Sequence, residues 1–288
     1  MEMISQVPRL PPRAPEGHKG TYGSVLIVAG SVGMSGAAIL CGSAALRSGA
    51  GLVRLAIPET IQAIVAAANP CYMTIGLAGD KVTGQWPFRW IPELLSWCQQ
   101  SDAIAVGPGW GTGGNQTAIL AELVRQLQPP LVVDADGLNA LVELPPDLLQ
   151  QRKSPTILTP HPGEFARLTA RSTQEIQAHR LDYAIAYAAA MNVILVLKGH
   201  QTIVTDGRRI YRNTSGNPGM ATGGSGDVLT GVVASLLASG MDPFEATILA
   251  VYIHGLAGDL GCAEFGETAL IASDLLSFLP RAFMTHAQ

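Results

Sequence analysis

Residues 24–57 read SVLIVAGSVGMSGAAILCGSAALRSGAGLVRLAI, and this stretch decides the fold class. It begins with a continuous apolar run, Ser24 to Ala29, of the kind found in strands that are buried on both faces. A glycine-rich turn leads into a helical segment at residues 36–50, and a second apolar run follows at residues 52–57. Because a strand, a helix and a strand follow one another, the stretch predicts a βαβ unit in a parallel sheet.

The same alternation continues along the chain. Further short apolar runs, most of them ending in a turn with Gly, Pro, Asp or His, lie at residues 103–106, 131–133, 156–158 and 193–197. Strand-like segments then follow in quick succession, and Asp206-Gly207 between two of them predicts an antiparallel hairpin. Three helical segments come last, at residues 227–239, 243–260 and 268–279. The sequence therefore predicts an α/β fold: a three-layer α/β/α sandwich with a mostly parallel central sheet and an antiparallel hairpin.

Composition limits both the domain count and the partners. The chain has 288 residues without an internal repeat or a low-complexity linker, so we expect a flexible leader at residues 1–16 and a single domain at residues 17–288. Hydrophobic residues make up 48% and charged residues 14%, which excludes a disordered chain and favours a homo-oligomer, with a tetramer as the expected size. A net charge of -4 argues against a nucleic-acid partner, which would require clustered Lys and Arg.

A mean hydropathy of +0.26 raises the question of a membrane segment. Residues 22–46 contain no charged side chain, but the turn at residues 30–36 breaks them, and exposed loop backbone is not stable in hydrocarbon. No other stretch offers a clean apolar span of about 18 to 20 residues. The N-terminus also lacks the basic start and apolar run of a signal peptide. We therefore expect a cytoplasmic protein without a membrane partner.

The segment with the most chemical signals is NPGMATGGSGD, residues 217–227, which leads directly into a helix. Its glycines allow close approach of a ligand, and the free N–H groups of a helix start bind anions, so we predict an anion hole at Gly224, Ser225 and Gly226. Asp227 would repel a bound phosphate, but it is suited to take a proton from an acceptor hydroxyl while the amides hold a moving phosphoryl group. Complementing the helix dipole is an equally simple explanation for this aspartate.

Ligands of open α/β sheets collect beyond the carboxyl ends of the strands, and two further strand ends carry polar signals. TPHPGE at residues 159–164 aims His161 rigidly from between two prolines, although a histidine satisfied within its own turn is the alternative. DADGLN at residues 134–139 supplies Asp134 and Asp136, which suit a water-mediated Mg²⁺ beside phosphates. The second aspartate would alternatively cap the next helix.

A third strand end carries KGHQT at residues 198–202. Its cationic and amide groups suit the phosphates or ribose of a nucleotide, and the alternative is an exposed lysine in a hairpin turn. The glycines of GWGTGG at residues 109–114 form only a partial dinucleotide fingerprint, since no acidic residue stands where a ribose partner is expected. No segment reads as a Walker A loop, and no second histidine stands at zinc-binding spacing from His161.

Seven motifs occur here in one order: GHKGTYGSVLIVAGS (17–31), SGAA (35–38), GPG (107–109), DADGLN (134–139), TPHPGE (159–164), KGHQT (198–202) and GMATGGSGDVLTG (219–231). This series resembles the ADP-dependent NAD(P)H-hydrate dehydratases of the ribokinase-like superfamily, over residues 17–280. The resemblance implies a ribokinase-like fold. Many relatives carry an additional epimerase domain before the match. We expect a stand-alone dehydratase that works with a separate NAD(P)H-hydrate epimerase.

The resemblance also implies a reaction. The S-epimer of hydrated NAD(P)H (NADHX or NADPHX) would be phosphorylated by ADP on its C6 hydroxyl and would then eliminate phosphate. NAD(P)H, AMP and phosphate would result, so the enzyme would be a hydro-lyase in metabolite repair, with ADP as co-substrate and Mg²⁺ as cofactor. A small-alcohol kinase that keeps its phosphorylated product, such as a vitamin-precursor kinase, is the alternative within the superfamily. A non-catalytic nucleotide-binding protein is the alternative from another class.

The family's roles transfer motif by motif. The resemblance implies that Ala37, with Ala38 as the alternative, lines the dinucleotide substrate together with Gly109 and His161, and that Asp227 sits at the reacting hydroxyl as the catalytic base. It implies that the adenine nucleotide contacts Lys198, Gly199, His200, Gln201, Thr202 and Gly226. Trp110 stands where a smaller aliphatic residue is expected, which predicts an altered lip of the pocket.

Overall fold

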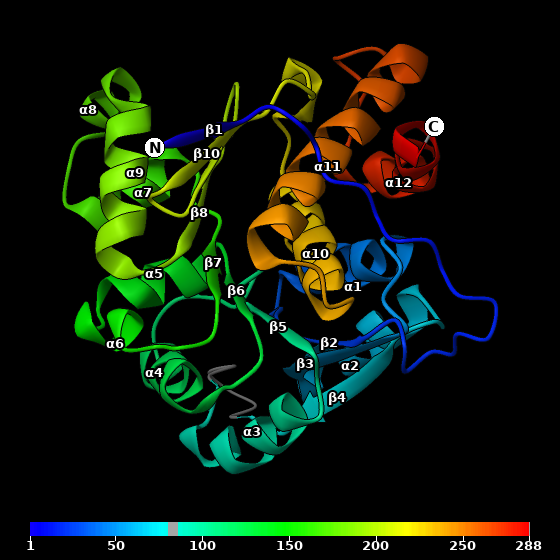
Figure 1. Cartoon of the computed structure of the whole chain (residues 1–288). Coiled ribbons are helices and arrows are strands. Elements are labelled where there is room, and N and C mark those ends of the chain that lie inside the picture. Colours follow the sequence, from blue (N-terminus) through cyan, green and yellow to red (C-terminus); the bar gives the residue numbers. More distant parts are fainter. Residues whose placement is uncertain (80–85, 288) are drawn as a thin grey trace.

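The computed structural model describes residues 1–79 and 86–287, and ten strands of this part form one mixed sheet (Figure 1). Their order across the sheet is β1-β10-β9-β8-β7-β6-β5-β2-β3-β4. The strands are β1 (Glu2–Ile4), β2 (Ser24–Val28), β3 (Leu52–Pro58), β4 (Met73–Leu77), β5 (Ala103–Val106), β6 (Leu131–Val133), β7 (Thr156–Leu158), β8 (Ile194–Leu197), β9 (Ile203–Thr205) and β10 (Arg209–Arg212).

Helices cover both faces of the sheet (Figure 1). The α-helices are α1 (Ser35–Arg47), α2 (Glu59–Ala68), α3 (Ile91–Gln99), α4 (Gln116–Gln126), α5 (Asp136–Val142), α6 (Asp147–Gln150), α7 (Pro162–Thr169), α8 (Thr173–Ala178), α9 (Arg180–Met191), α10 (Ser225–Ala238), α11 (Pro243–Phe265) and α12 (Ala272–Ala287). Short 3₁₀ turns lie at Phe88–Trp90 and Pro218–Met220.

Two apolar cores lie on the two faces of the sheet. One core packs α1, α2, α10, α11 and α12 on one face, and the other packs helices of the α3–α9 region on the opposite face. The strand residues alternate between the two cores, as Val25 and Ile27 join the first and Leu26 and Val28 join the second. The predicted three-layer α/β/α sandwich is therefore confirmed.

The sequence-based pairing is confirmed as well. β2 pairs with β3 in parallel, with Ser24 opposite Leu52, as the βαβ prediction requires. Six parallel pairings join the strands from β4 to β8, and β9 runs antiparallel to both β8 and β10. In the predicted hairpin turn, Asp206 Oδ1 accepts hydrogen bonds from the backbone N–H groups of Arg208 and Arg209.

The sheet has a topological switch point between β2 and β5. From β2 the chain adds β3 and β4 toward one edge of the sheet, and from β5 it adds β6, β7 and β8 toward the other edge. The loops after these two strands meet there, because Gly30 N donates to Pro108 O at 2.8 Å and Ser31 Oγ donates to Gly109 O at 2.9 Å. Switch points of open α/β sheets hold ligands, since the two diverging loops leave a crevice. The site is therefore expected beside these loops.

Two sequence-based expectations need revision. The N-terminal leader begins with β1, which pairs with β10 at the edge of the sheet, while residues 5–23 contain no helix or strand. Helix α11 is also long and apolar enough to cross a membrane by length and composition, contrary to the expectation that no such stretch exists. Because 61% of its apolar window is buried among other elements, including α10 and α12, α11 has the burial of a core helix.

Candidate active site

The first turn of α10 carries the predicted anion hole. Gly224, with φ of +95°, precedes the helix, and no side chain caps it. Ser225 N has a long contact of 3.4 Å to Thr222 O, whereas the N–H groups of Gly226 and Asp227 have no protein acceptor within the described residues. Two amides at the positive end of a 14-residue helix are therefore available to an anion. In the first turn the open amides are those of Gly226 and Asp227, and the N–H of Gly224, just before the helix, also has no acceptor among the described residues. Of the three predicted residues, only Ser225 has its N–H in contact with an acceptor.

The Lys198 ammonium lies against this helix start. A Cβ added to Gly226 would lie 3.2 Å from Lys198 Nζ, and Nζ itself lies 2.8 Å from Asp134 Oδ1 and 3.8 Å from Glu164 Oε2. Burial opposes the charged form, but Asp134 and Glu164 outweigh it and raise the pKa of Lys198, so the ammonium stays charged. Lys198 is thus an ion-paired, largely buried side chain and not an exposed hairpin lysine.

The two aspartates of DADGLN have different surroundings. Asp134 is almost completely buried, and its second oxygen, Oδ2, accepts a hydrogen bond from Thr230 Oγ1 at 2.8 Å. Asp136 is the first residue of α5 and does not cap it, so the capping alternative is wrong. Its Oδ2 accepts from Gly111 N at 2.8 Å instead, which ties the loop after β5 to the end of β6.

Asp227 differs from these carboxylates because its side chain has no hydrogen-bond partner in the part of the chain that the structure describes. Burial, followed by the negative charge of Asp134, raises the pKa of Asp227 to about 7. A helix dipole alone would favour the charged form and lower this pKa. The arrangement therefore favours a proton acceptor that works near neutrality over a residue that only complements the dipole.

His161 caps α7 through a capping box. Its Nδ1 accepts from Gly163 N at 3.0 Å and from Glu164 N at 3.3 Å, while Glu164 Oε2 accepts from His161 N at 2.7 Å. Burial is the first cause of the lowered pKa of His161. Since Nδ1 accepts, Nε2 carries the ring proton in the neutral form. Nε2 lies 3.5 Å from Glu164 Oε1, and about half of the side chain is exposed, so the ring is held against Glu164 while part of it stays open to solvent.

Ala37 and Gly109 meet at the switch point. Gly109 has φ of +57°, and a Cβ at this position would lie 2.7 Å from Ala37 Cβ. Ala38 is fully buried, whereas Ala37 is partly exposed, so Ala37 is the alanine that a ligand can reach. The tight contact requires glycine at position 109, because any side chain there would displace the start of α1.

Arg180, at the start of α9, holds the loop at residues 198–202. Its guanidinium donates to His200 O at 2.7 Å, to Leu197 O at 3.1 Å and to Lys198 O at 3.2 Å. The loop needs this support because Gly199 and Gln201 both have positive φ. Thr202 Oγ1 closes the turn by donating to Gly199 O at 2.9 Å.

Sequence reasoning missed four residues of the site: Glu164, Arg180, Thr230 and His254. The sequence pattern could have indicated Glu164, since a glutamate three residues after a capping residue is typical of a capping box. His254 had a weaker one, as a polar residue within an apolar helix. Arg180 and Thr230 had none, because their partners lie 17 to 96 residues away in the chain.

The expectation for Trp110 was wrong. Its ring is fully buried and packs edge-to-face on Trp86 with 5.6 Å between ring centroids. Trp86 in turn packs on Trp90 at 5.4 Å. The large side chain fills the core below the loop after β5 and does not shape the lip of the site.

The donors around α10 suit Mg²⁺ only in part. Carboxylate oxygens are the ligands that Mg²⁺ prefers, and Asp134, Asp136 and Asp227 are close enough to affect one another's charge. Among the described residues, however, no group of three His, Cys, Asp or Glu side chains is placed to hold a metal. Because Asp134 is engaged by Lys198 and Thr230, the geometry fits an ion held mainly by phosphates and water, with Asp136 as the more accessible carboxylate.

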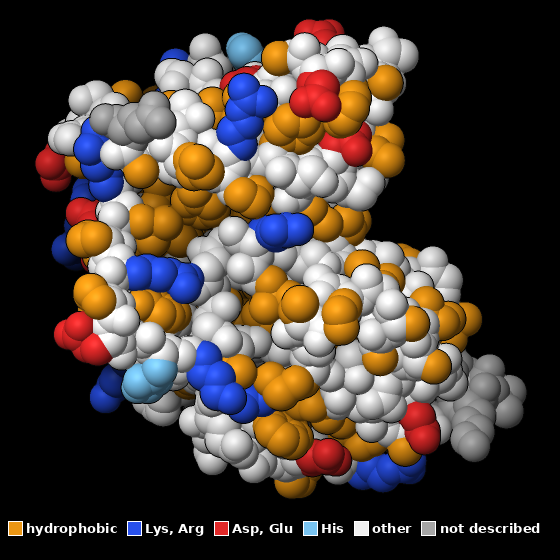
Figure 2. All heavy atoms as spheres, turned by 90° about the vertical axis from the view of Figure 1, so that its right-hand side faces the viewer, with side chains coloured by type: hydrophobic (Ala, Val, Ile, Leu, Met, Phe, Trp, Pro, Cys, Tyr) orange, Lys and Arg blue, Asp and Glu red, His pale blue; other side chains and the backbone are white. Residues whose placement is uncertain are grey.

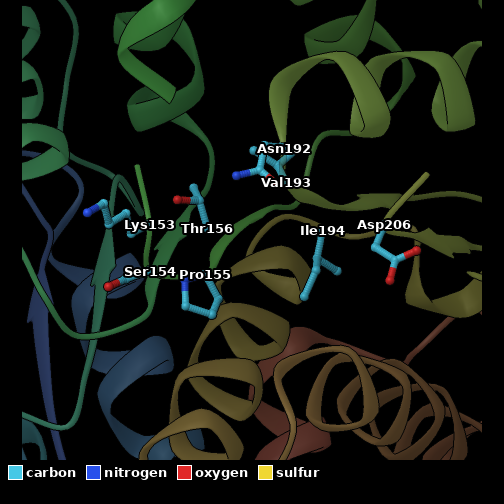
Figure 3. Close-up of a pocket in the computed structure, with 8 residues that line it drawn as sticks. All are labelled: Lys153, Ser154, Pro155, Thr156, Asn192, Val193, Ile194 and Asp206. Atoms are coloured by element: carbon cyan, nitrogen blue, oxygen red, sulfur yellow. The ribbon is translucent and has the colours of Figure 1, made fainter. Parts of the chain in front are cut away.

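A separate hollow of about 200 Å³ lies at the opposite, amino edge of the sheet (Figure 3). It borders the segments that enter β7 and β8 and contains none of the predicted site residues. Its lining consists of Lys153, Ser154, Pro155, Thr156, Asn192, Val193, Ile194 and Asp206. This hollow therefore lies apart from the charged groups and open amides at the start of α10.

Known proteins resemble this chain along almost its whole length. The ADP-dependent (S)-NAD(P)H-hydrate dehydratase of Bacillus subtilis is 36% identical over 278 residues, which cover 95% of this chain and 94% of that protein. The crystal structure of the ADP/ATP-dependent NAD(P)H-hydrate dehydratase from Bacillus subtilis, co-crystallised with ATP and Mg²⁺, superposes with a TM-score of 0.81 at 34% identity, covering 96% of this chain and 94% of that one. A ribokinase-like superfamily protein from Enterococcus faecalis superposes with a TM-score of 0.84 at 26% identity, covering 99% and 96%.

Longer proteins match as well. The bifunctional NAD(P)H-hydrate repair enzyme Nnr of Moorella thermoacetica is 43% identical over 274 residues, 94% of this chain and 51% of that protein. The chain thus spans about half the length of the first curated relatives it matches. The family described as NAD(P)H-hydrate dehydratase matches residues 25–281. With this match over most of the ribokinase-like fold, the chain belongs to the NAD(P)H-hydrate dehydratase family.

Proposed function

We propose that this chain is an ADP-dependent hydro-lyase that dehydrates the S-epimer of hydrated NAD(P)H and so repairs the damaged cofactor. The observation that carries the proposal is the carboxylate of Asp227, which has no hydrogen-bond partner among the described residues and a pKa of about 7, beside two open amides and the Lys198 ammonium. The name of the Bacillus subtilis relative supports the same substrate and the same nucleotide.

The first step is a phosphoryl transfer. Asp227 takes the proton of the C6 hydroxyl while the oxygen forms a bond to the β-phosphorus of ADP, and the bond from that phosphorus to the bridging oxygen of AMP breaks. The amides of Gly226 and Asp227 and the Lys198 ammonium stabilise negative charge on the moving phosphoryl group. This arrangement requires an ionised Asp227, which a pKa of about 7 permits at neutral pH.

The second step is an elimination. The lone pair of the ring nitrogen forms a double bond to C6 as the C6–O bond breaks and phosphate leaves. Loss of a proton from C5 then restores the C5–C6 double bond of the dihydronicotinamide. The sum is hydrate plus ADP giving NAD(P)H, AMP, phosphate and one proton, so the oxygen of the original hydroxyl leaves within the phosphate.

The co-crystallised ATP and Mg²⁺ of the Bacillus subtilis structure support Mg²⁺ as the cofactor of this chain. When bound, Mg²⁺ supplies charge neutralisation at the transferring phosphates. The chain would hold it through water, with Asp136 as the more accessible carboxylate and Asp134 as the second. Asp134 also keeps Lys198 in place, because its Oδ1 accepts from Lys198 Nζ while its Oδ2 accepts from Thr230 Oγ1, which holds the carboxylate.

Product analysis tests the proposal. Each hydrate consumed in the presence of ADP and Mg²⁺ should return one NAD(P)H, one AMP and one free phosphate, measured by absorbance and by chromatography of a quenched reaction. A stable phosphate ester with little free phosphate would instead identify a small-alcohol kinase. Repair without any nucleotide, or nucleotide binding without turnover, would also contradict the proposal.

We further propose a homo-oligomer, with a tetramer as the expected size, that acts in the cytoplasm and works with an NAD(P)H-hydrate epimerase. The names of the bifunctional relatives support the link to the epimerase. Exposed apolar side chains support association, and hydrophobic side chains are visible among polar ones on the side of the molecule that carries α11 and α12 (Figure 2). In that region Phe265, Ile271 and Met284 are 46%, 52% and 67% exposed. Sedimentation of the purified protein measures the assembly.

A further inference from the structure

Helix α11 carries polar side chains that the proposed reaction does not use. His254 Nε2 lies 2.9 Å from Ser225 O, at the start of α10. One and a half turns further along, Asp259 accepts hydrogen bonds from Gly216 N and from Asn217 Nδ2, both at 2.9 Å. Helix α11 therefore holds the glycine-rich segment at both ends, before and after its exposed middle.

Close packing between these anchors prevents the segment from sinking toward α11. A Cβ added to Gly258 would lie 2.1 Å from Met220 Sδ, and one added to Gly255 would lie 2.2 Å from Ser215 Oγ. Ser215 Oγ also donates to Tyr252 O at 2.8 Å. A Cβ at Gly223, in the middle of the segment, would have no atom within 4 Å, so the backbone there is open.

Chemistry determines which nitrogen of His254 carries the proton. A carbonyl oxygen only accepts hydrogen bonds, so Nε2 must be the donor to Ser225 O. Burial, together with the positive charge of Lys198, lowers the pKa of His254 to about 4, although the hydrogen bond to Ser225 O acts in the opposite direction. The ring is therefore a neutral donor throughout the physiological pH range.

The acceptor of this hydrogen bond belongs to the anion hole. Ser225 C=O and Gly226 N–H are parts of one peptide unit, and Gly226 N–H is one of the two open amides. A hydrogen bond donated to the carbonyl oxygen fixes the plane of that unit and polarises it, which makes the N–H a stronger donor. The side chain of Ser225 further restrains this residue, because its Oγ donates a hydrogen bond to Met220 O at 2.9 Å.

We propose that His254 is a positioning residue for the anion hole: by donating Nε2–H to Ser225 O, it aims and strengthens the Gly226 amide that stabilises the moving phosphoryl group. This role rests on the proposed function, because the amide has a catalytic effect only if a phosphoryl group is transferred there. His254 itself does not touch the reacting atoms and acts through the Ser225–Gly226 peptide.

Two substitutions at one position test the role. His254→Leu removes the donor and should lower kcat about 10- to 100-fold with less than a threefold change in KM for either substrate, since the amide acts mainly on charge in the transition state. His254→Gln places an amide N–H near the position of Nε2 and should recover most of kcat. Equal losses in both variants, or a loss confined to KM, would overturn the proposal.

A spectroscopic measurement separates this role from the proposed reaction. The sequence contains five Ser-Gly pairs, including Ser215-Gly216 and Ser225-Gly226, so carbonyl-¹³C serine with ¹⁵N glycine yields five peptide signals. His254→Leu should shift one of them and His254→Gln should restore it, whereas Asp259→Asn should shift a different one. ADP with Mg²⁺ should perturb the His254-dependent signal in the wild type and less in His254→Leu. An unchanged set of signals would overturn the role of His254, while inactive wild-type protein with these shifts intact would overturn only the reaction.

Discussion

The two edges of the sheet hold charged groups in different ways. At the amino edge, Asp102 Oδ2 accepts from Ser24 N at 2.7 Å and from Ser24 Oγ at 2.9 Å. Arg152 donates there to the carbonyl oxygens of Val124, Leu127 and Pro129 at 3.2, 2.6 and 2.5 Å. At the carboxyl edge, Asp227 has no hydrogen-bond partner within the described chain and shares its surroundings with Asp134 and Lys198.

This difference separates structural charges from chemical ones. A charge that is held by hydrogen bonds from neighbouring segments connects those segments and has little capacity left for a ligand. A buried carboxylate without a partner, beside other carboxylates, is costly to the fold, and such costs are concentrated at functional sites. The amino-edge groups should therefore matter for stability, and the carboxyl-edge groups for turnover.

The largest effect on turnover is expected for Asp227→Asn. The substitution removes the proton acceptor with little change in shape, and loss of a general base lowers rates by about 10²- to 10⁴-fold. ADP binding should stay nearly intact, because the amides and Lys198 remain. Initial rates and calorimetric titration with ADP measure the two effects.

Asp102→Asn is the matched control at the amino edge and should leave kcat within about twofold of the wild type. If the turnover of Asp227→Asn stays within about threefold of the wild type, Asp227 only complements the dipole of α10 and is not the base. Equal losses in the two variants would show that the contrast between the edges does not hold.

The pH dependence should be the next largest effect. Asp227 must be ionised to accept a proton, and its pKa of about 7 lies above the ordinary value of 3.8. Protonation therefore removes the base as pH falls, and kcat/KM should decline about tenfold per unit below pH 7, or about a hundredfold at pH 5. Rates between pH 5 and 9 measure this limb. A flat profile in the wild type would contradict the assignment of Asp227, and Asp227→Asn should lose the limb.

The sequence alone predicted some strands of the sheet and missed others, depending on how long and continuous their apolar runs are. Strands β2, β5, β6 and β7 were predicted within one residue because each is a buried, continuous apolar run. β4 was missed because Gly76 and the exposed Met73 interrupt its pattern, and β1 has only three residues. Short apolar runs without periodicity carry too little information to place an edge strand.

The site shows the same limit. Motifs located Asp134, His161, Lys198 and Asp227, because glycines and prolines mark the turns at which ligands bind. They did not reveal that Lys198 pairs with Asp134, 64 residues away, since long-range pairs leave no local pattern. The charged state of Asp227 likewise depends on burial and on neighbours from other strands, which only the fold brings together.

His161 should have an intermediate effect. His161→Ala removes the exposed ring edge and should weaken the hydrated dinucleotide about tenfold while changing ADP affinity less than threefold, because a fixed ring loses little entropy on binding. The variant also removes the cap of α7, which is worth about 1 kcal/mol. His161→Asn keeps a capping side chain without the ring, and steady-state constants of both variants separate the two losses.

Weaker substrate binding in both variants would assign the effect to the ring. Normal binding in His161→Asn would mean that His161 serves only as the helix cap. Equal weakening of dinucleotide and ADP would remove the residue from the substrate side of the site.

The smallest effect on turnover, together with a large effect on stability, is expected for Arg152→Met. Methionine fills a similar length but donates no hydrogen bond, so three carbonyl oxygens between α4 and β6 lose their donor at once. Unsatisfied buried groups destabilise by about 1–3 kcal/mol each, so urea unfolding should lose at least about 2 kcal/mol even after partial relaxation. Burial already lowers the pKa of Arg152 to about 10, so the charged guanidinium is costly at this place in the fold. Because these carbonyls lie at the edge away from Asp227, kcat/KM of the folded variant should stay within twofold. A tenfold loss of kcat/KM in folded Arg152→Met would mean that the two edges are coupled through β6 and β7. In that case, hydrogen bonds to backbone carbonyls would not by themselves identify a charged side chain as purely structural.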